Sequence, residues 1–117
     1  MADAPDGSAS TILAGEDGKL VTLARATRAR TGALQGAAVR DTDGRTYAAA
    51  SVSLPSLKLS ALQVAVAMAL SSGAPGLEAA VVLSAGAQPD PDGAAAVAEL
   101  APSAPVYLVD ERGRLPG

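Results

Sequence analysis

One uncharged stretch in the middle of the chain limits the possible folds more than any other feature. From Leu59 to Leu77 no residue carries a charge. A membrane-spanning helix needs about 20 mostly apolar residues, and here the unbroken apolar run extends only from Val64 to Leu70. Polar or helix-breaking residues interrupt the rest of the stretch: Gln63, Ser71, Ser72, Gly73 and Pro75. The stretch therefore predicts a buried helix of a soluble protein.

The expected bounds of this helix follow from the residues that flank it. Ser53 and Ser56 offer two possible N-caps, and Gly73 with Pro75 predicts an end near Ser72. Residues 57–70 are apolar in almost every direction around the helix axis, which is typical of a helix buried on several sides. One sheet in so small a domain cannot cover all of it. We therefore expect a homo-oligomer, a dimer or tetramer, or else an unknown protein partner.

The composition of the core is also restricted. The 117 residues suffice for one domain, with a disordered tail expected at residues 1–15 and the domain at residues 16–117. There is no Phe or Trp, only Tyr47 and Tyr107, and roughly a quarter of the residues are alanine. Such a core depends on close approach of backbones and many small contacts.

The remaining elements follow from periodicity and turn signals. Leu20, Leu23, Ala24 and Thr27 define one face of a helix that begins near Asp17 and ends at Thr31-Gly32. The Asp43-Gly44 pair predicts a hairpin turn between two strands. The other expected elements are strands at 35–41, 46–53, 78–84 and 105–109 and a helix at 94–101 capped by Asp92. This order predicts an α/β fold whose sheet begins with a hairpin.

Composition excludes several functions. The sequence contains no cysteine and no histidine, so disulfides, thiolate chemistry and the usual nitrogen and sulfur metal ligands are all missing. The net charge of −3 gives no overall field that favours nucleic acid. The first residues are acidic, whereas a signal peptide begins with basic residues. We expect a cytoplasmic protein that binds neither nucleic acid nor membrane.

Several motifs in this order resemble the cytidine deaminase family. The segment 36–39, Asp43-Gly44-Arg45 and Tyr47 resemble the family's first hairpin. Ser60-Ala61-Leu62 falls where the family has Cys-Ala-Glu, and residues 89–93 fall where it has Pro-Cys-Gly-x-Cys. The segments 98–102 and 105–108 resemble its third helix and the following strand. The resemblance covers about residues 20–110. It implies a three-layer α/β/α sandwich with a mixed sheet of about four strands.

The resemblance also implies a zinc site that this sequence does not supply. In the family, three Cys or His side chains hold zinc, and a Glu transfers protons between the metal-bound water and the base. The corresponding positions here are Ser60, Asp90 and Gly93 for the ligands and Leu62 for the Glu. We therefore expect no zinc, no other cofactor, no catalytic residue and no enzyme activity.

The same resemblance suggests a changed ligand pocket. The family's ribose-binding Asn and Glu align with Ser51 and Ser53. The expected pocket residues are Ser51, Ser53, Ser60, Leu62 and Asp90. The leading hypothesis is a non-catalytic deaminase-like protein that acts through association with itself or with a partner. The alternatives are a binding module for a nucleoside-like or small apolar ligand, and an enzyme with metal-free chemistry.

Other polar residues have a functional and a simpler interpretation. Lys58 lies two positions before Ser60, a spacing that directs the two side chains apart on a helix, so a serine–lysine pair is not expected. Asp41 and Asp43 begin like a calcium loop but fit a hairpin turn better. Asp90 and Asp92 fit turn and cap positions better than a cation site. The arginines at 25, 28 and 30 form either a phosphate patch or a solvated helix face.

Overall fold

The structure, a computed structural model, describes residues 11–116. Within these residues there are three helices: α1 (Gly15–Thr31), α2 (Ala61–Ser71) and α3 (Pro91–Leu100). The strands are β1 (Thr11–Ile12), β2 (Gln35–Asp41), β3 (Thr46–Ala50), β4 (Val52–Leu54), β5 (Leu57–Leu59), β6 (Leu77–Ser84), β7 (Val106–Val109) and β8 (Arg114–Leu115). The first ten residues of the expected tail lie outside the described residues. Of its last five residues, Thr11–Ile12 form β1, and α1 begins at Gly15.

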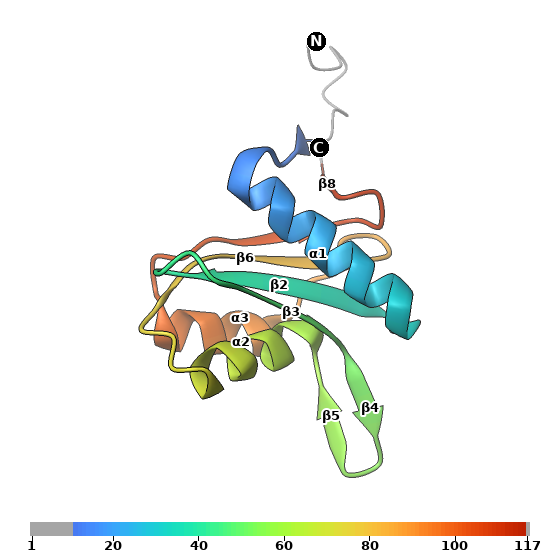
Figure 1. Ribbon diagram of the computed structural model, residues 1–117. Helices are drawn as coiled ribbons and strands as arrows, with labels where there is room; N and C mark the ends of the chain where they lie inside the picture. The colour runs from blue at the N-terminus through green and yellow to red at the C-terminus, as the bar shows by residue number, and fades with distance from the viewer. Residues whose placement is uncertain (1–10, 117) are drawn as a thin grey trace.

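The central sheet has the strand order β3-β2-β6-β7. Strand β2 is antiparallel to both β3 and β6, whereas β6 and β7 are parallel. Helix α1 covers one face of the sheet, and α2 and α3 cover the other (Figure 1). The predicted three-layer α/β/α sandwich with a mixed four-stranded sheet is confirmed.

Alternating residues of the buried strands contribute to two separate cores. On β6, Val81 and Leu83 face α1, whereas Ala80 and Val82 face α2 and α3. The backbones approach closely where small residues permit it. A Cβ added to Gly36 of β2 would overlap the carbonyl group of Ala24 in α1 and would lie 3.0 Å from the Cβ of Arg28. Only glycine fits at this crossing of helix and strand.

The turn between β2 and β3 has the hairpin structure that Asp43-Gly44 predicts. One carboxylate oxygen of Asp41, Oδ1, accepts hydrogen bonds from the amides of Asp43 and Arg45, each 2.9 Å long, and Oδ2 accepts one of 2.8 Å from the Tyr47 hydroxyl. Burial opposes the charged form of Asp41, but these hydrogen bonds outweigh it and hold the pKa of Asp41 below its ordinary value. Asp41 therefore has a structural role in this turn.

The central helix begins later than the sequence predicts. Residues 52–59 form a separate hairpin of β4 and β5, in which Leu54 pairs with Leu57 across a turn at Pro55 and Ser56. The helix starts at Ala61 with Ser60 as its N-cap, so neither Ser53 nor Ser56 caps it. The expected apolar helix from residue 57 is wrong over its first turn because the chain pairs there as strands.

Helix α2 is buried on one side and open on the other. Its inner face includes Leu62 and Ala65, both fully buried. Its outer face includes Ala67, Met68 and Leu70, which are exposed. Among the described helices, none combines the length and the apolar character needed to cross a membrane. The cytoplasmic location expected from the sequence stays a prediction.

Candidate ligand pocket

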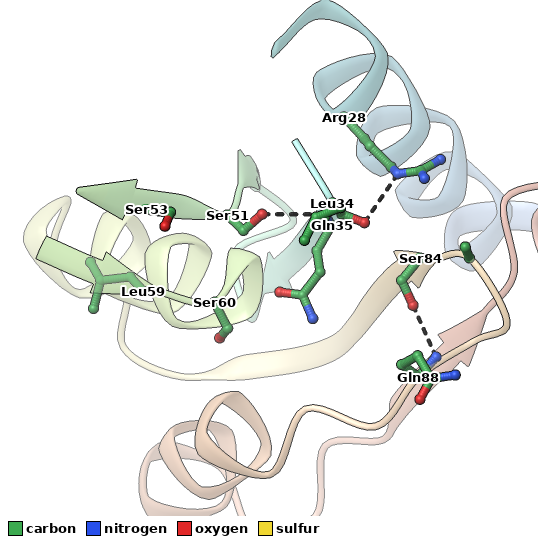
Figure 2. Close-up of a pocket in the computed structure, with 10 residues that line it drawn as sticks. Arg28, Leu34, Gln35, Ser51, Ser53, Leu59, Ser60, Ser84 and Gln88 are labelled. Carbon is green, nitrogen blue, oxygen red and sulfur yellow. Dashed lines mark hydrogen bonds between the residues drawn. The ribbon is translucent and has the colours of Figure 1, made fainter. Parts of the chain in front are cut away.

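A cavity of about 400 Å³ lies at the edge of the sheet where β2 begins, β6 ends and α2 starts. Its volume falls within the range of about 300–1,000 Å³ that is typical of small-molecule sites. Polar side chains and a few apolar ones line it (Figure 2): Arg28, Leu34, Gln35, Ser51, Ser53, Leu59, Ser60, Ser84, Ala85 and Gln88.

The pairing of β2 with β6 brings residues distant in the sequence to this cavity. Gln35 at the start of β2 is opposite Ser84 at the end of β6. The Gln35 amide N–H donates to Ser51 Oγ at 3.2 Å, which links β2 to the chain between β3 and β4. The side-chain oxygen of Gln35 accepts a hydrogen bond of 3.2 Å from the amide of Ala61 at the start of α2. These contacts hold β2, β6, the residue after β3 and the start of α2 together around the pocket.

Two further serines are fixed by local hydrogen bonds. Ser60 forms a capping box: its Oγ accepts from the Gln63 amide at 3.1 Å, and the Gln63 side chain accepts from the Ser60 amide at 2.9 Å. Ser84, which is buried, accepts from the Gln88 amide at 2.9 Å (Figure 2). The turn after β6 is thereby held against the pocket.

Arg28 is the one charged residue among those that line the pocket. It lies in the last turn of α1, where its Nε donates to the Leu34 carbonyl at 3.2 Å. Within the part of the chain that the structure describes, Arg28 forms no ion pair, and no Asp or Glu lines the pocket. The pocket therefore carries a local positive charge in a chain whose net charge is negative.

Leu62 and Asp90 lie in the core, outside the lining of this pocket. A Cβ added to Gly93 would lie 2.6 Å from the Leu62 Cβ and 2.5 Å from Asp90 Oδ2, so the three residues are in close contact. Asp90 caps α3 through a hydrogen bond of 3.1 Å from the Gly93 amide to Oδ1, and its buried Oδ2 has no hydrogen-bond partner within residues 11–116. Leu62 fills the space between α2 and α3.

These residues do not fit the zinc site that the deaminase resemblance implies. Of the three ligand positions, Ser60 provides a hydroxyl group that is used in capping, Asp90 one carboxylate, and Gly93 no side chain. The described residues contain no group of three His, Cys, Asp or Glu side chains placed to hold a metal ion. A tetrahedral zinc centre normally needs nitrogen and sulfur ligands, and the sequence contains neither Cys nor His.

The structure thus brings together part of the set expected from the sequence. Ser51, Ser53 and Ser60 share the pocket, whereas Leu62 and Asp90 lie behind it. Gln35, Ser84 and Gln88 were not among the residues expected from the sequence, and Arg28 was expected in either a phosphate patch or a solvated helix face. One signal could have identified Ser84: it ends a buried strand, and ligands in α/β sheets bind at the carboxyl ends of strands.

Comparisons with known proteins agree with this fold. Residues 13–113 match the family described as cytidine deaminase-like. The chain resembles the crystal structure of cytidine deaminase from Burkholderia pseudomallei, with a TM-score of 0.71 and 23% identity over 81% of this chain and 85% of that one. It also resembles cytidine deaminase from Mycobacterium leprae, with a TM-score of 0.64 and 20% identity over 84% of this chain and 90% of that one. No curated protein matches the sequence significantly.

These matches contradict the prediction that the chain is not an enzyme. The matching family and both solved structures carry the name of an enzyme, cytidine deaminase. The missing ligands argue against a zinc centre of the usual kind at these positions. They do not show that the chain lacks enzyme activity.

Proposed function

The chain belongs to the cytidine deaminase-like family, and from this premise we propose that it binds a nucleoside-like small molecule in the pocket between β2, β6 and α2. The cavity of about 400 Å³ is the observation that supports this proposal. Its walls combine apolar contact from Leu34 and Leu59 with the hydrogen-bonding groups of four serines and two glutamines. A combination of apolar contact with polar groups that fix the orientation of the ligand is typical of small-molecule sites.

The names of the two similar structures indicate which ligands to test first. Both are cytidine deaminases, so the probes are cytidine, deoxycytidine and uridine. Binding to the folded state stabilises it by RT ln(1 + [L]/Kd), so the melting temperature rises with the logarithm of ligand concentration once this exceeds Kd. We expect at least one nucleoside to raise it and to give a saturable heat in calorimetry. Ammonia release from cytidine, measured on the same samples, tests whether the bound ligand is also converted.

A variant that fills the cavity tests the location of the site. Ala85 is exposed and lines the pocket, so Ala85→Phe places a ring in the cavity without disturbing the core. Ala98→Phe makes the same change at an exposed position of α3 that does not line the pocket. Ala85→Phe should abolish nucleoside binding, and Ala98→Phe should preserve it. Equal binding by both variants would place the ligand elsewhere.

The open side of α2 supports a second candidate function, association with another copy of the chain. Val64, Ala67, Met68 and Ser71 lie at helical spacing along one groove, together with Leu59 from β5. Exposed Leu54, Leu57 and Leu70 add to the apolar surface of the hairpin and helix. Contiguous apolar patches of this kind mark interaction sites on soluble proteins.

The absence of charge on this surface favours a second copy as the occupant. No residue from Leu59 to Leu77 is charged, so the groove offers nothing to a charged partner. Small Ala67 and Ser71 permit close approach of an equivalent helix, and a two-fold axis makes the same patch complementary to itself. Light scattering at low micromolar protein should give a dimer or tetramer, and Met68→Glu should yield a monomer of 11.4 kDa. A monomeric wild type would refute this candidate.

A further inference from the structure

Among the described residues, the hydrogen bonds around the pocket use serine oxygens as acceptors and leave their O–H donors free. The oxygens of Ser51, Ser60 and Ser84 each accept a backbone N–H, from Gln35, Gln63 and Gln88 respectively. Each hydroxyl therefore retains its proton for donation, together with one of its two lone pairs. Three separate local motifs, a strand contact, a helix cap and a turn, produce the same result. The pocket therefore offers a hydroxyl donor at each of these three positions to the acceptors of a ligand.

The side chain of Gln35 also keeps a hydrogen-bond donor free. Its carbonyl oxygen is occupied by the amide of Ala61 at the start of α2. The NH₂ group of Gln35 is the part that remains, and it can only donate. Because the amide of Ala61 requires an acceptor, rotation of the carboxamide by a half-turn would leave that amide unpaired. Gln35 therefore adds a further donor to the three serine hydroxyls.

Arg28 adds a positive charge to this set of donors. Its Nε is used by the Leu34 carbonyl, and this contact anchors the guanidinium group at the pocket. The two terminal nitrogens form no ion pair among the described residues, and no carboxylate lines the cavity to neutralise them. An arginine matches the geometry of a phosphate group, which can accept two parallel hydrogen bonds.

From these observations we propose that the ligand is anionic: a nucleoside that carries a phosphate monoester, with the phosphate held by Arg28 and by the serine hydroxyls. This inference rests on the proposed function, since it specifies the ligand of the same pocket. Phosphate oxygens accept hydrogen bonds and do not donate when fully ionised, so they complement each free donor of the pocket. A neutral nucleoside leaves the charge of Arg28 without a partner.

Calorimetry with three probes tests this proposal: cytidine, cytidine 5′-monophosphate and inorganic phosphate. We expect the monophosphate to bind at least about tenfold more tightly than cytidine, since a tenfold change in Kd corresponds to about 1.4 kcal/mol. The preference should decrease as salt concentration rises. Binding of cytidine with no gain for the monophosphate overturns this inference and leaves the proposed function intact. Absence of binding by any probe overturns both, and binding of phosphate alone as tightly as the monophosphate overturns the nucleoside part.

Matched arginine variants test the role of Arg28. Arg28→Gln should weaken monophosphate binding about tenfold with little change for cytidine. Arg30→Gln removes the same charge from the same turn of α1, outside the pocket, and should leave both affinities unchanged. Arg28→Lys keeps the charge and should retain most of the preference, which separates an electrostatic role from a fold defect. An equal loss in the Arg28→Gln and Arg30→Gln variants would show a general effect of net charge and would refute the assignment to Arg28.

Discussion

Gly93 offers a sharp test of the packing behind the pocket. In Gly93→Ala the new Cβ would lie 2.5 Å from Asp90 Oδ2, 2.6 Å from the Leu62 Cβ and 2.9 Å from the Leu62 Cγ. Ordinary contacts between carbon atoms are about 3.5–4.0 Å. Leu62 is fully buried and Gly93 lies in the first turn of α3, so neither can move away freely. The substitution therefore forces α2 and α3 apart or displaces the cap of Asp90.

The expected cost follows from two opposing effects. Overpacking of a buried site destabilises proteins by about 1–3 kcal/mol, whereas alanine in place of glycine stabilises a helix interior by up to about 1 kcal/mol. We expect Gly93→Ala to lower the free energy of unfolding by about 1–2 kcal/mol. Leu62→Ala alone should cost about 3–5 kcal/mol because it leaves a cavity. Alanine at position 62 keeps the Cβ and removes only the contact to Cγ, so the two changes should be additive to within about 0.5 kcal/mol.

Urea unfolding at one fixed protein concentration provides the measurement. Gly76→Ala is the matched control, because its new Cβ would make only ordinary contacts with the Thr42 side chain, at 3.4 Å from Cγ2 and 3.9 Å from Oγ1. This control should change the stability by less than about 0.5 kcal/mol. A neutral or stabilising Gly93→Ala would refute the close packing of Leu62 against α3.

Three further outcomes are expected. Ser60→Ala should lower the free energy of unfolding by about 1 kcal/mol through loss of the helix cap, whereas Ser56→Ala should be nearly neutral. Equal effects of the two variants in urea unfolding would contradict a helix that starts after Ser60. Gly36→Ala should destabilise the protein more than Gly93→Ala, because its Cβ meets the backbone of α1; a melting temperature close to the wild type would disprove this crossing. The lowered pKa of Asp41 contributes stability above the ordinary aspartate range, which is lost as pH falls through the lowered value. The stability difference between wild type and Tyr47→Phe should therefore shrink in acid, and a constant difference from neutral to acidic pH would contradict the Tyr47–Asp41 hydrogen bond.

The elements with strong local signals were predictable from the sequence. Asp43-Gly44 fixes a turn that its own hydrogen bonds complete, and Gly32 ends α1 in the left-handed conformation that glycine adopts most easily. The order of elements then led to the correct layered fold. These predictions depended on short-range chemistry, which a sequence displays directly.

The start of α2 was not predictable in the same way. Val52, Leu54, Leu57 and Leu59 alternate with other residues, a strand pattern that is interrupted by the turn at Pro55 and Ser56. The same apolar residues also fit the first turn of a helix. The start of the helix at Ala61 is supported by Gln35, whose side-chain oxygen accepts a hydrogen bond from the Ala61 amide. Gln35 lies in β2, 26 positions earlier in the sequence. A contact of that range has no local signature.

The candidate site was partly predictable for a similar reason. Ser51, Ser53 and Ser60 were found through alignment with motifs of the family. Arg28 belongs to a helix face that looks solvated in sequence, and only the approach of α1 to the end of β6 places it at a cavity. The pocket depends on that tertiary contact.

The short pairing of β1 with β8 has a practical consequence for fused proteins. Thr11 lies opposite Leu115, so both ends of the described domain emerge side by side. They do so on the α1 side of the sheet, whereas α2 and the hairpin of β4 and β5 lie on the other side (Figure 1). A domain attached at either end therefore leaves the α2 groove accessible. For the same reason, a brief linker can join residues 11 and 115, and new termini opened at Pro55 and Ser56 would give a circular permutant with every layer of the sandwich intact.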